Sequence, residues 1–122
     1  MPLQTVAVLG ASGNPQRYSS LAVKLLLEKG HRVVPVNPAL NEIEGLAVAK
    51  SLEDLVDPVD TLTIYVAASR LPDMAADIIP LRPGRVIFNP GTESPELQSA
   101  LDQAGIPWIE ACTLVLLRSG QF

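Results

Sequence analysis

A short stretch near the N-terminus constrains the fold most strongly, because an apolar strand runs directly into a glycine-bearing loop and then into a helical pattern. Residues 6–9 are apolar, and Gly10 and Gly13 interrupt the chain just after them. A helical pattern opens at Ser19 or Ser20. This order brings backbone N–H groups and the positive end of a helix dipole to one place. The stretch therefore predicts an anion site at the start of an α/β fold.

Three further features of the loop favour a phosphate ligand. The glycines let the main chain turn sharply and approach a ligand without a Cβ atom in the way. Pro15 stiffens the loop, and Arg17 adds a guanidinium group whose geometry suits phosphate oxygens. A tight turn with a solvated arginine is the simpler interpretation of the same residues.

Strand and helix patterns alternate along the whole chain. Strands are expected at 5–9, 32–36, 47–49, 61–67, 85–88 and 107–110, and a loop at 39–46. Helices are expected from Ser19 or Ser20 to 29, and at 51–55, 72–79, 94–104 and 112–117. Ser19 or Ser20, Ser51 and Ser94 are expected to cap helices, and Gly30 and Gly105 to end two of them in the left-handed conformation.

This alternation predicts an α/β fold with a parallel sheet and helices on both faces. Right-handed crossovers give a Rossmann-like open sheet of about five strands in the order 3-2-1-4-5. Ligands bind such sheets at the carboxyl ends of the strands, where the chain reverses direction across the sheet. The loops at 10–17, 37–38, 67–69 and 89–91 are expected to meet there around one cleft.

Composition narrows the class of protein. The chain has 122 residues, with 13 acidic and 9 basic side chains and a net charge of −4, which argues against nucleic-acid binding. Its length predicts a single domain over 1–122. It has no apolar run of the ~18 residues that a membrane span needs. The short N-terminal segment leaves no room for a signal peptide. One cysteine, Cys112, suits a reducing cytoplasm.

The glycine spacing and the end of the second strand distinguish between nucleotides. A dinucleotide site for NAD has the pattern G-x-G-x-x-G and an acidic residue after the second strand. This chain has Gly10-x-x-Gly13, and Asn37-Pro38 stands where the acid is expected. An NADP site would have a cation after that strand, and residues 39–42 offer none. Both departures count against a nicotinamide cofactor.

Several motifs together resemble the small stand-alone CoA-binding proteins, which are similar to the N-terminal domain of the succinyl-CoA synthetase α-subunit. The motifs are Gly10-x-Ser12-x-x-Pro15-x-Arg17, Val34-Pro35-Val36-Asn37-Pro38, Ser51-Leu52-x-Asp54-Leu55 and Pro58-Val59-Asp60. The resemblance covers nearly the whole chain. It implies a Rossmann-like domain that holds the ADP part of CoA or an acyl-CoA, with the glycine loop near the phosphates.

The resemblance and the loop positions together give the predicted ligand-site residues. They are Gly10, Ala11, Ser12, Gly13, Pro15, Arg17, Tyr18, Ser19, Asn37, Pro38, Ala67, Asn89 and Gly91. Asn37 and Asn89 have an alternative role as strand terminators, and Tyr18 either covers a base or packs on the loop. His31 is expected to be structural and Cys112 to be a small core residue, so no catalytic or metal-binding residue is predicted.

Two cations that family members often carry are absent from this chain. Tyr65-Val66 replaces an aromatic–Arg pair, and Glu110-Ala111-Cys112 replaces an Asp-Arg-Cys pattern. Asn89-Pro90-Gly91 also replaces Gln-x-Gly. Three hypotheses follow: a non-catalytic module for CoA or acyl-CoA, an NAD(P)-dependent oxidoreductase, and an interaction protein that has lost its ligand. Association with a second copy or with a partner enzyme stays open.

Overall fold

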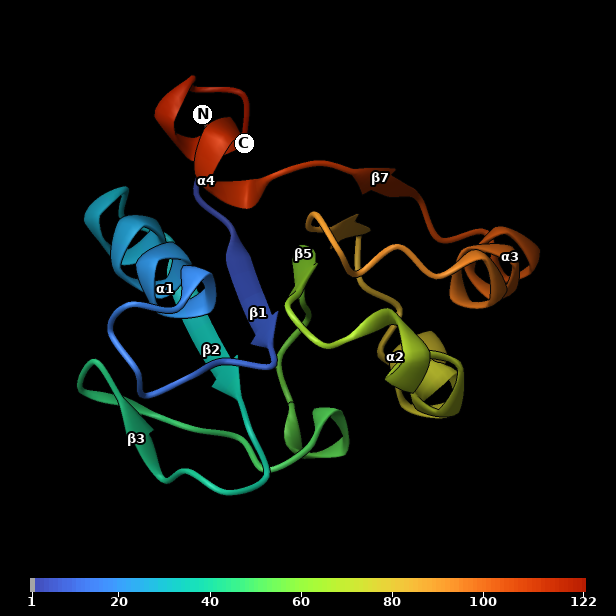
Figure 1. Ribbon diagram of the computed structural model, residues 1–122, viewed down its shortest axis with the longest axis horizontal. Helices are drawn as coiled ribbons and strands as arrows, with labels where there is room; N and C mark the ends of the chain where they lie inside the picture. Colours follow the sequence, from blue (N-terminus) through green and yellow to red (C-terminus); the bar gives the residue numbers. More distant parts are fainter. Residues whose placement is uncertain (1) are drawn as a thin grey trace.

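A computed structural model describes residues 2–122, and its centre is a five-stranded parallel sheet (Figure 1). The strands follow the order β2-β1-β5-β6-β7, and all neighbouring pairs are parallel. This architecture confirms the predicted Rossmann-like fold class. The strands are β1 (Thr5–Leu9), β2 (Arg32–Val36), β5 (Thr61–Ile64), β6 (Arg85–Phe88) and β7 (Trp108–Glu110).

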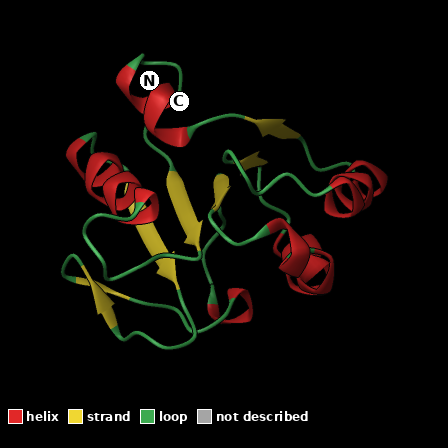
Figure 2. Ribbon diagram, viewed as in Figure 1, coloured by secondary structure: helices red, strands yellow, loops and turns green. Residues whose placement is uncertain are grey.

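Helices cover both faces of the sheet (Figure 2). On one face α1 packs against α4, and on the other α2 packs against α3. No helix within residues 2–122 is long and apolar enough to cross a membrane. The α-helices are α1 (Tyr18–Glu28), α2 (Ala75–Leu81), α3 (Pro95–Ala104) and α4 (Thr113–Arg118), and the short 3₁₀ helices are η1 (Leu52–Asp54), η2 (Ala68–Arg70) and η3 (Pro72–Met74).

The apolar strands are explained by burial on both faces. Along β1, Ala7 and Leu9 face the core under α2 and α3, whereas Val6 and Val8 face the core under α1. Successive side chains of a strand point to opposite faces, so a strand covered on both sides has no polar position to alternate with. The uninterrupted apolar run at the N-terminus is thus the sequence signature of this central strand.

The expected third strand is largely missing from the sheet. Residues Leu46–Ala47 (β4) pair instead with Glu42–Ile43 (β3) in a small antiparallel hairpin. All but Ala47 of this hairpin falls in the segment 39–46 that was predicted to be a loop. Beyond it, Ala49 alone bridges to Val36 at the edge of β2. The carbonyl of Pro35 accepts the Ala49 amide at 2.9 Å, so the missing N–H of Pro35 lies on this same outer edge. A full ladder would lose a hydrogen bond there.

Two other elements end at different residues from those predicted. Strand β5 ends at Ile64 and not at 67, because its partner β1 ends at Leu9 and the chain turns away at Gly10. The segment predicted as one helix at 72–79 is divided between η3 and α2.

The capping predictions had mixed outcomes. Ser94 caps α3 by accepting the amide of Leu97 at 3.2 Å, and Gly30 and Gly105 take the predicted left-handed conformation. The serines at the start of α1 are not caps: this helix begins at Tyr18, and its N-cap residue Arg17 makes no capping hydrogen bond with its side chain. Ser51 does not cap the backbone of η1 either.

Candidate functional site

A cleft of about 740 Å³ opens at the carboxyl ends of β1, β2 and β5. The predicted loops do converge here, and two further segments around Lys50 and Arg70 join them. The cleft is lined by Leu9, Gly10, Ala11, Ser12, Arg17, Tyr18, Ser19, Val36, Asn37, Pro38, Lys50, Ser51, Leu52, Tyr65, Val66, Ala67, Arg70, Met74, Asp77, Pro90, Gly91 and Thr92.

Most of the predicted site residues line this cleft, but three do not. Gly13 and Pro15 lie in the exposed outer part of the glycine loop, and Asn89 is buried. The residues that sequence reasoning missed include Lys50, Tyr65 and Arg70. A signal for Lys50 and Arg70 was available, because each cation stands within three residues of the end of a predicted strand.

Gly10 starts the loop and fixes where it leaves the sheet. Its φ is +84°, and the amides of Gly10 and Ala11 both donate to the carbonyl of Val36, at 3.1 and 3.2 Å. A Cβ on Gly10 would lie 2.9 Å from Cγ2 of Val66 and 3.0 Å from the carbonyl oxygen of Tyr65. A Cβ at this position would therefore clash with Tyr65 and Val66 and would not point toward a ligand, which corrects the expected role of this glycine.

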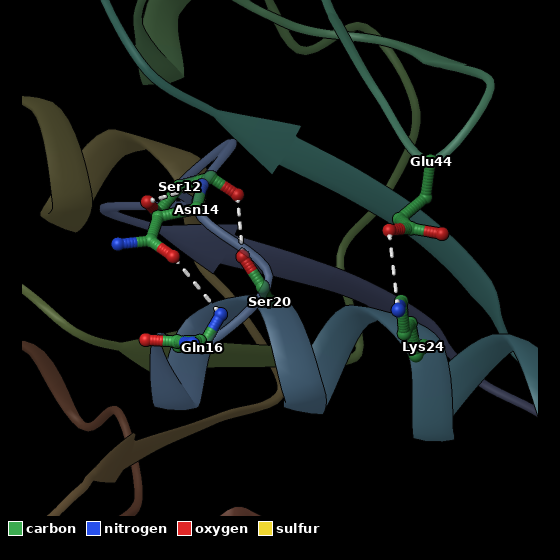
Figure 3. A network of polar contacts seen from close by, with 6 residues as sticks. All are labelled: Ser12, Asn14, Gln16, Ser20, Lys24 and Glu44. Atoms are coloured by element: carbon green, nitrogen blue, oxygen red, sulfur yellow. Dashed lines mark hydrogen bonds and ion pairs between the residues drawn. The ribbon is translucent and has the colours of Figure 1, made fainter.

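The rest of the loop is held by its own side chains (Figure 3). The Asn14 amide donates to Ser12 Oγ, and the Gln16 amide donates to Asn14 Oδ1, both at 3.0 Å. Ser20 Oγ donates to the carbonyl of Ser12 at 2.6 Å, which joins the loop to α1. These bonds preorganise the loop, and a preformed site pays less ordering entropy on binding.

Backbone donors of the loop and of the first turn of α1 are left without acceptors. Within residues 2–122, no protein group accepts a hydrogen bond from the amides of Ser12, Gly13, Tyr18, Ser19 or Ser20. The first turn of a helix always leaves amides unpaired, and the helix dipole adds positive potential there. Ser12, Tyr18 and Ser19 line the cleft, so the part of the cleft beside the glycine loop presents free amide donors that can bind an anion.

Three cations line the cleft, against one carboxylate, Asp77. Arg17 and Arg70 are exposed, and neither guanidinium group forms a hydrogen bond or an ion pair with any residue in 2–122. Lys50 Nζ donates to the carbonyl of Leu40 and to Asn41 Oδ1, both at 2.8 Å. The cleft is therefore locally positive although the chain carries a net charge of −4.

The two asparagines are engaged by the protein. Asn37 Nδ2 donates to the carbonyl of Ala11 at 2.8 Å, and its Oδ1 accepts the Ala39 amide at 2.7 Å, so this side chain ties the glycine loop to β2. Asn89 is 2% exposed, and its Nδ2 donates to Thr63 Oγ1 while its Oδ1 accepts the Thr113 amide. Asn89 thus joins β6 to β5 and α4, and we leave it out of the proposed ligand contacts.

The histidine and the cysteine of the sequence lie outside the cleft, and Tyr65, which lines the cleft, has a buried hydroxyl. His31 is buried at the amino end of β2, where its Nδ1 accepts the Gln4 amide at 3.0 Å, which confirms a structural role. Cys112 is half-buried and is not among the residues that line the cleft. Tyr65 lines the cleft, but burial of its hydroxyl raises its pKa to about 12, against the opposing effect of Thr113 and Thr63. That hydroxyl has no partner with hydrogen-bond geometry in residues 2–122.

An open parallel α/β sheet with a cationic, glycine-lined cleft at its carboxyl edge defines a nucleotide-binding protein of the Rossmann class. The family model described as a CoA binding domain matches residues 4–118. The chain belongs to this CoA-binding domain family.

Individual proteins also resemble this chain in sequence and structure. A structure titled as cell-free ID.343 from Thermus thermophilus is 38% identical, covers 98% of this chain and 91% of its own, and has a TM-score of 0.91. The uncharacterized protein YneT of Bacillus subtilis is 30% identical over 74 residues, which are 61% of this chain and 55% of that relative.

A larger protein contains the same fold. Acetyl-coenzyme A synthetase 1 of Ca. Korarchaeum cryptofilum in its apo form aligns with 87% of this chain at 24% identity and a TM-score of 0.75. The match spans 25% of the synthetase, so at this identity the likeness concerns the fold of one part of that protein.

Proposed function

We propose that this chain is a single-domain binding module that holds CoA or an acyl-CoA in the cleft at the carboxyl edge of its sheet. The observation that carries the proposal is the set of unpaired amides at Ser12, Gly13 and the first turn of α1, beside the unpaired guanidinium of Arg17. The ADP part of CoA contains a pyrophosphate, and such a group can accept hydrogen bonds from both kinds of donor at once.

CoA is favoured over a nicotinamide dinucleotide by the end of β2. A carboxylate at this position would accept hydrogen bonds from the ribose hydroxyls of NAD. Here the position holds Asn37, whose amide is already bonded to Ala11 and Ala39. Membership in the CoA-binding domain family supports the same choice of ligand.

The proposal assigns no chemical step to this protein. General acid–base chemistry requires a titratable group within hydrogen-bond reach of the reacting atoms. The described residues that line the cleft include neither histidine nor cysteine, and the Tyr65 hydroxyl is buried with its pKa raised to about 12. The one carboxylate in the lining, Asp77, lies beside Glu53. We therefore expect the purified chain to bind acyl-CoA without consuming it.

Isothermal titration with CoA and with NAD tests the proposal. Wild-type protein should bind CoA and show no saturable heat with NAD. Arg17→Met should weaken CoA binding about tenfold or more, because a charge-assisted hydrogen bond contributes about 1.5–3 kcal/mol. Arg118→Met, an exposed arginine in the last turn of α4, is the matched control and should bind as wild type does. Binding of NAD as tight as that of CoA would overturn the proposal.

A further inference from the structure

The cations of the cleft stand on two different walls. Arg17 immediately precedes α1, Arg70 ends η2, and Lys50 lies between β4 and η1. Lys50 is two residues before Leu52, and Arg70 is immediately before Leu71. Both leucines are buried in the core that packs under α2 and α3, which fixes these two segments as one wall.

The second wall is cationic and its arginine is available. Arg70 ends η2 and is exposed, and its guanidinium group has no acceptor or ion-pair partner in residues 2–122. The carboxylate that lines the cleft, Asp77, lies beside Glu53 and raises the pKa of Glu53. Within residues 2–122 Asp77 forms no ion pair with Arg70 or with any other cation.

The ammonium group of Lys50 is held by a different segment. Its Nζ donates to the Leu40 carbonyl and to Asn41 Oδ1 at 2.8 Å each, both uncharged acceptors, and the Leu40 side chain packs with the core under α1 and lies beside Gly13. An ammonium group has three donors, so one remains for a ligand. The two walls together form a cleft with separated positive charges, and a ligand that fills it should carry two separated anionic groups.

We infer that Arg70 forms a second anion subsite that binds the 3′-phosphate of CoA, apart from the pyrophosphate site at the glycine loop. This inference rests on the proposed function and names the feature of the ligand that the site selects. A phosphomonoester is close to doubly charged at neutral pH and presents three acceptor oxygens, which suits the several donors of a guanidinium group. The subsite also explains how the chain supplies phosphate cations without an arginine after Tyr65.

Dephospho-CoA is the direct probe, because it differs from CoA only in lacking the 3′-phosphate. Wild-type protein should bind CoA at least tenfold more tightly than dephospho-CoA in isothermal titration. Arg70→Met should remove most of this preference by weakening CoA alone, and Arg70→Lys should retain part of it. Arg118→Met is again the matched control, and circular dichroism checks that each variant is folded.

Each outcome separates this inference from the proposed function. Equal affinity of wild-type protein for CoA and dephospho-CoA would overturn the second subsite and leave the CoA-binding proposal standing. Equal weakening of both ligands by Arg70→Met would place Arg70 on the shared part of the ligand and would also overturn it. If wild-type protein bound neither ligand, the proposed function itself would fail, and the inference with it.

Discussion

The amino and carboxyl ends of the parallel sheet both carry arginines, and the two sets are held differently. At the amino end, Arg85 donates from Nε to Thr61 Oγ1 at 2.9 Å and from Nη2 to the Phe122 carbonyl at 2.7 Å. At the carboxyl end, the guanidinium groups of Arg17 and Arg70 have no acceptor within residues 2–122. The same side chain is thus a fixed structural element at one end and an available donor at the other.

Aromatic rings show the same contrast. Phe122 is 7% exposed, packs on His31 with 5.2 Å between ring centroids, and lies under the Arg85 guanidinium at 4.6 Å. Tyr18, beside the cleft, is 72% exposed. Buried polar groups are normally paired, whereas donors that face solvent can exchange water for a ligand. The Arg85 guanidinium group at the amino end of the sheet is thus paired within the protein, whereas the carboxyl end keeps donors free for the proposed ligand.

Gly10 lies at the carboxyl end of the sheet, but the fold itself requires a glycine there. Among these variants, Gly10→Ala should therefore lower the free energy of unfolding the most. A positive φ and a Cβ at 2.9 Å from Val66 should together lower the free energy of unfolding by about 2–4 kcal/mol. Urea denaturation measures this loss. Gly13→Ala is the control, since its Cβ would meet only Leu40 Cδ1 at 3.6 Å, and it should change stability by less than about 0.5 kcal/mol. Equal stabilities of the two variants would contradict this account of the loop.

Arg85→Met should show the opposite profile to the cleft arginines. It removes charge-assisted hydrogen bonds to Thr61 and Phe122 and should lower the free energy of unfolding by about 2 kcal/mol. Affinity for CoA, measured by titration calorimetry on the folded variant, should stay unchanged because Arg85 is at the far end of the sheet. A stable variant with weakened binding would break the division between the two ends.

The stability of the amino end should also depend on pH through His31. Burial, followed by nearby positive charges that include Arg85, lowers the pKa of His31 below 6.5. The unfolded chain then binds the proton more readily, so the stabilising contribution is complete above pH 6.5 and is lost as the pH falls toward the lowered pKa. Thermal unfolding of wild type and His31→Gln at several pH values measures this. The variant should lose the part of the pH dependence near 6.5, and an identical slope in both proteins would contradict the prediction.

Sequence patterns predicted the fold well because its causes are local. The apolar run before Gly10 and the cap at Ser94 each depend on a few neighbouring residues, and the structure has them as expected. The outer strand failed because its pairing depends on Pro35, whose missing N–H lies on the edge that the third strand would use. The α1 caps failed because Ser20 bonds to Ser12 across the loop, a contact that spacing alone does not reveal.

Site residues that belong to a sequence motif could be predicted, whereas residues that come from other segments of the chain could not. The glycine loop and Asn37 were found from the sequence, and the cleft lies beside both. Lys50 and Arg70 line the same cleft beside Leu52 and Leu71, which pack in one core, so their place there depends on the tertiary fold. Asn89 looked like a ligand residue because it ends a strand, but its burial at 2% exposure comes from contacts with Thr63 and Thr113.

The most direct test of the central claim is a titration of ¹⁵N-labelled protein with CoA, followed by amide chemical shifts. The largest chemical-shift changes should fall on the amides of the glycine loop and of the first turn of α1 that have no acceptor within residues 2–122. These amides belong to Ser12, Gly13, Tyr18, Ser19 and Ser20. Amides at the amino end, such as Gln4, which is bonded to His31, should stay unchanged. Shifts that cluster at the amino end, or no saturable shifts at all, would contradict the claim that the carboxyl edge binds CoA.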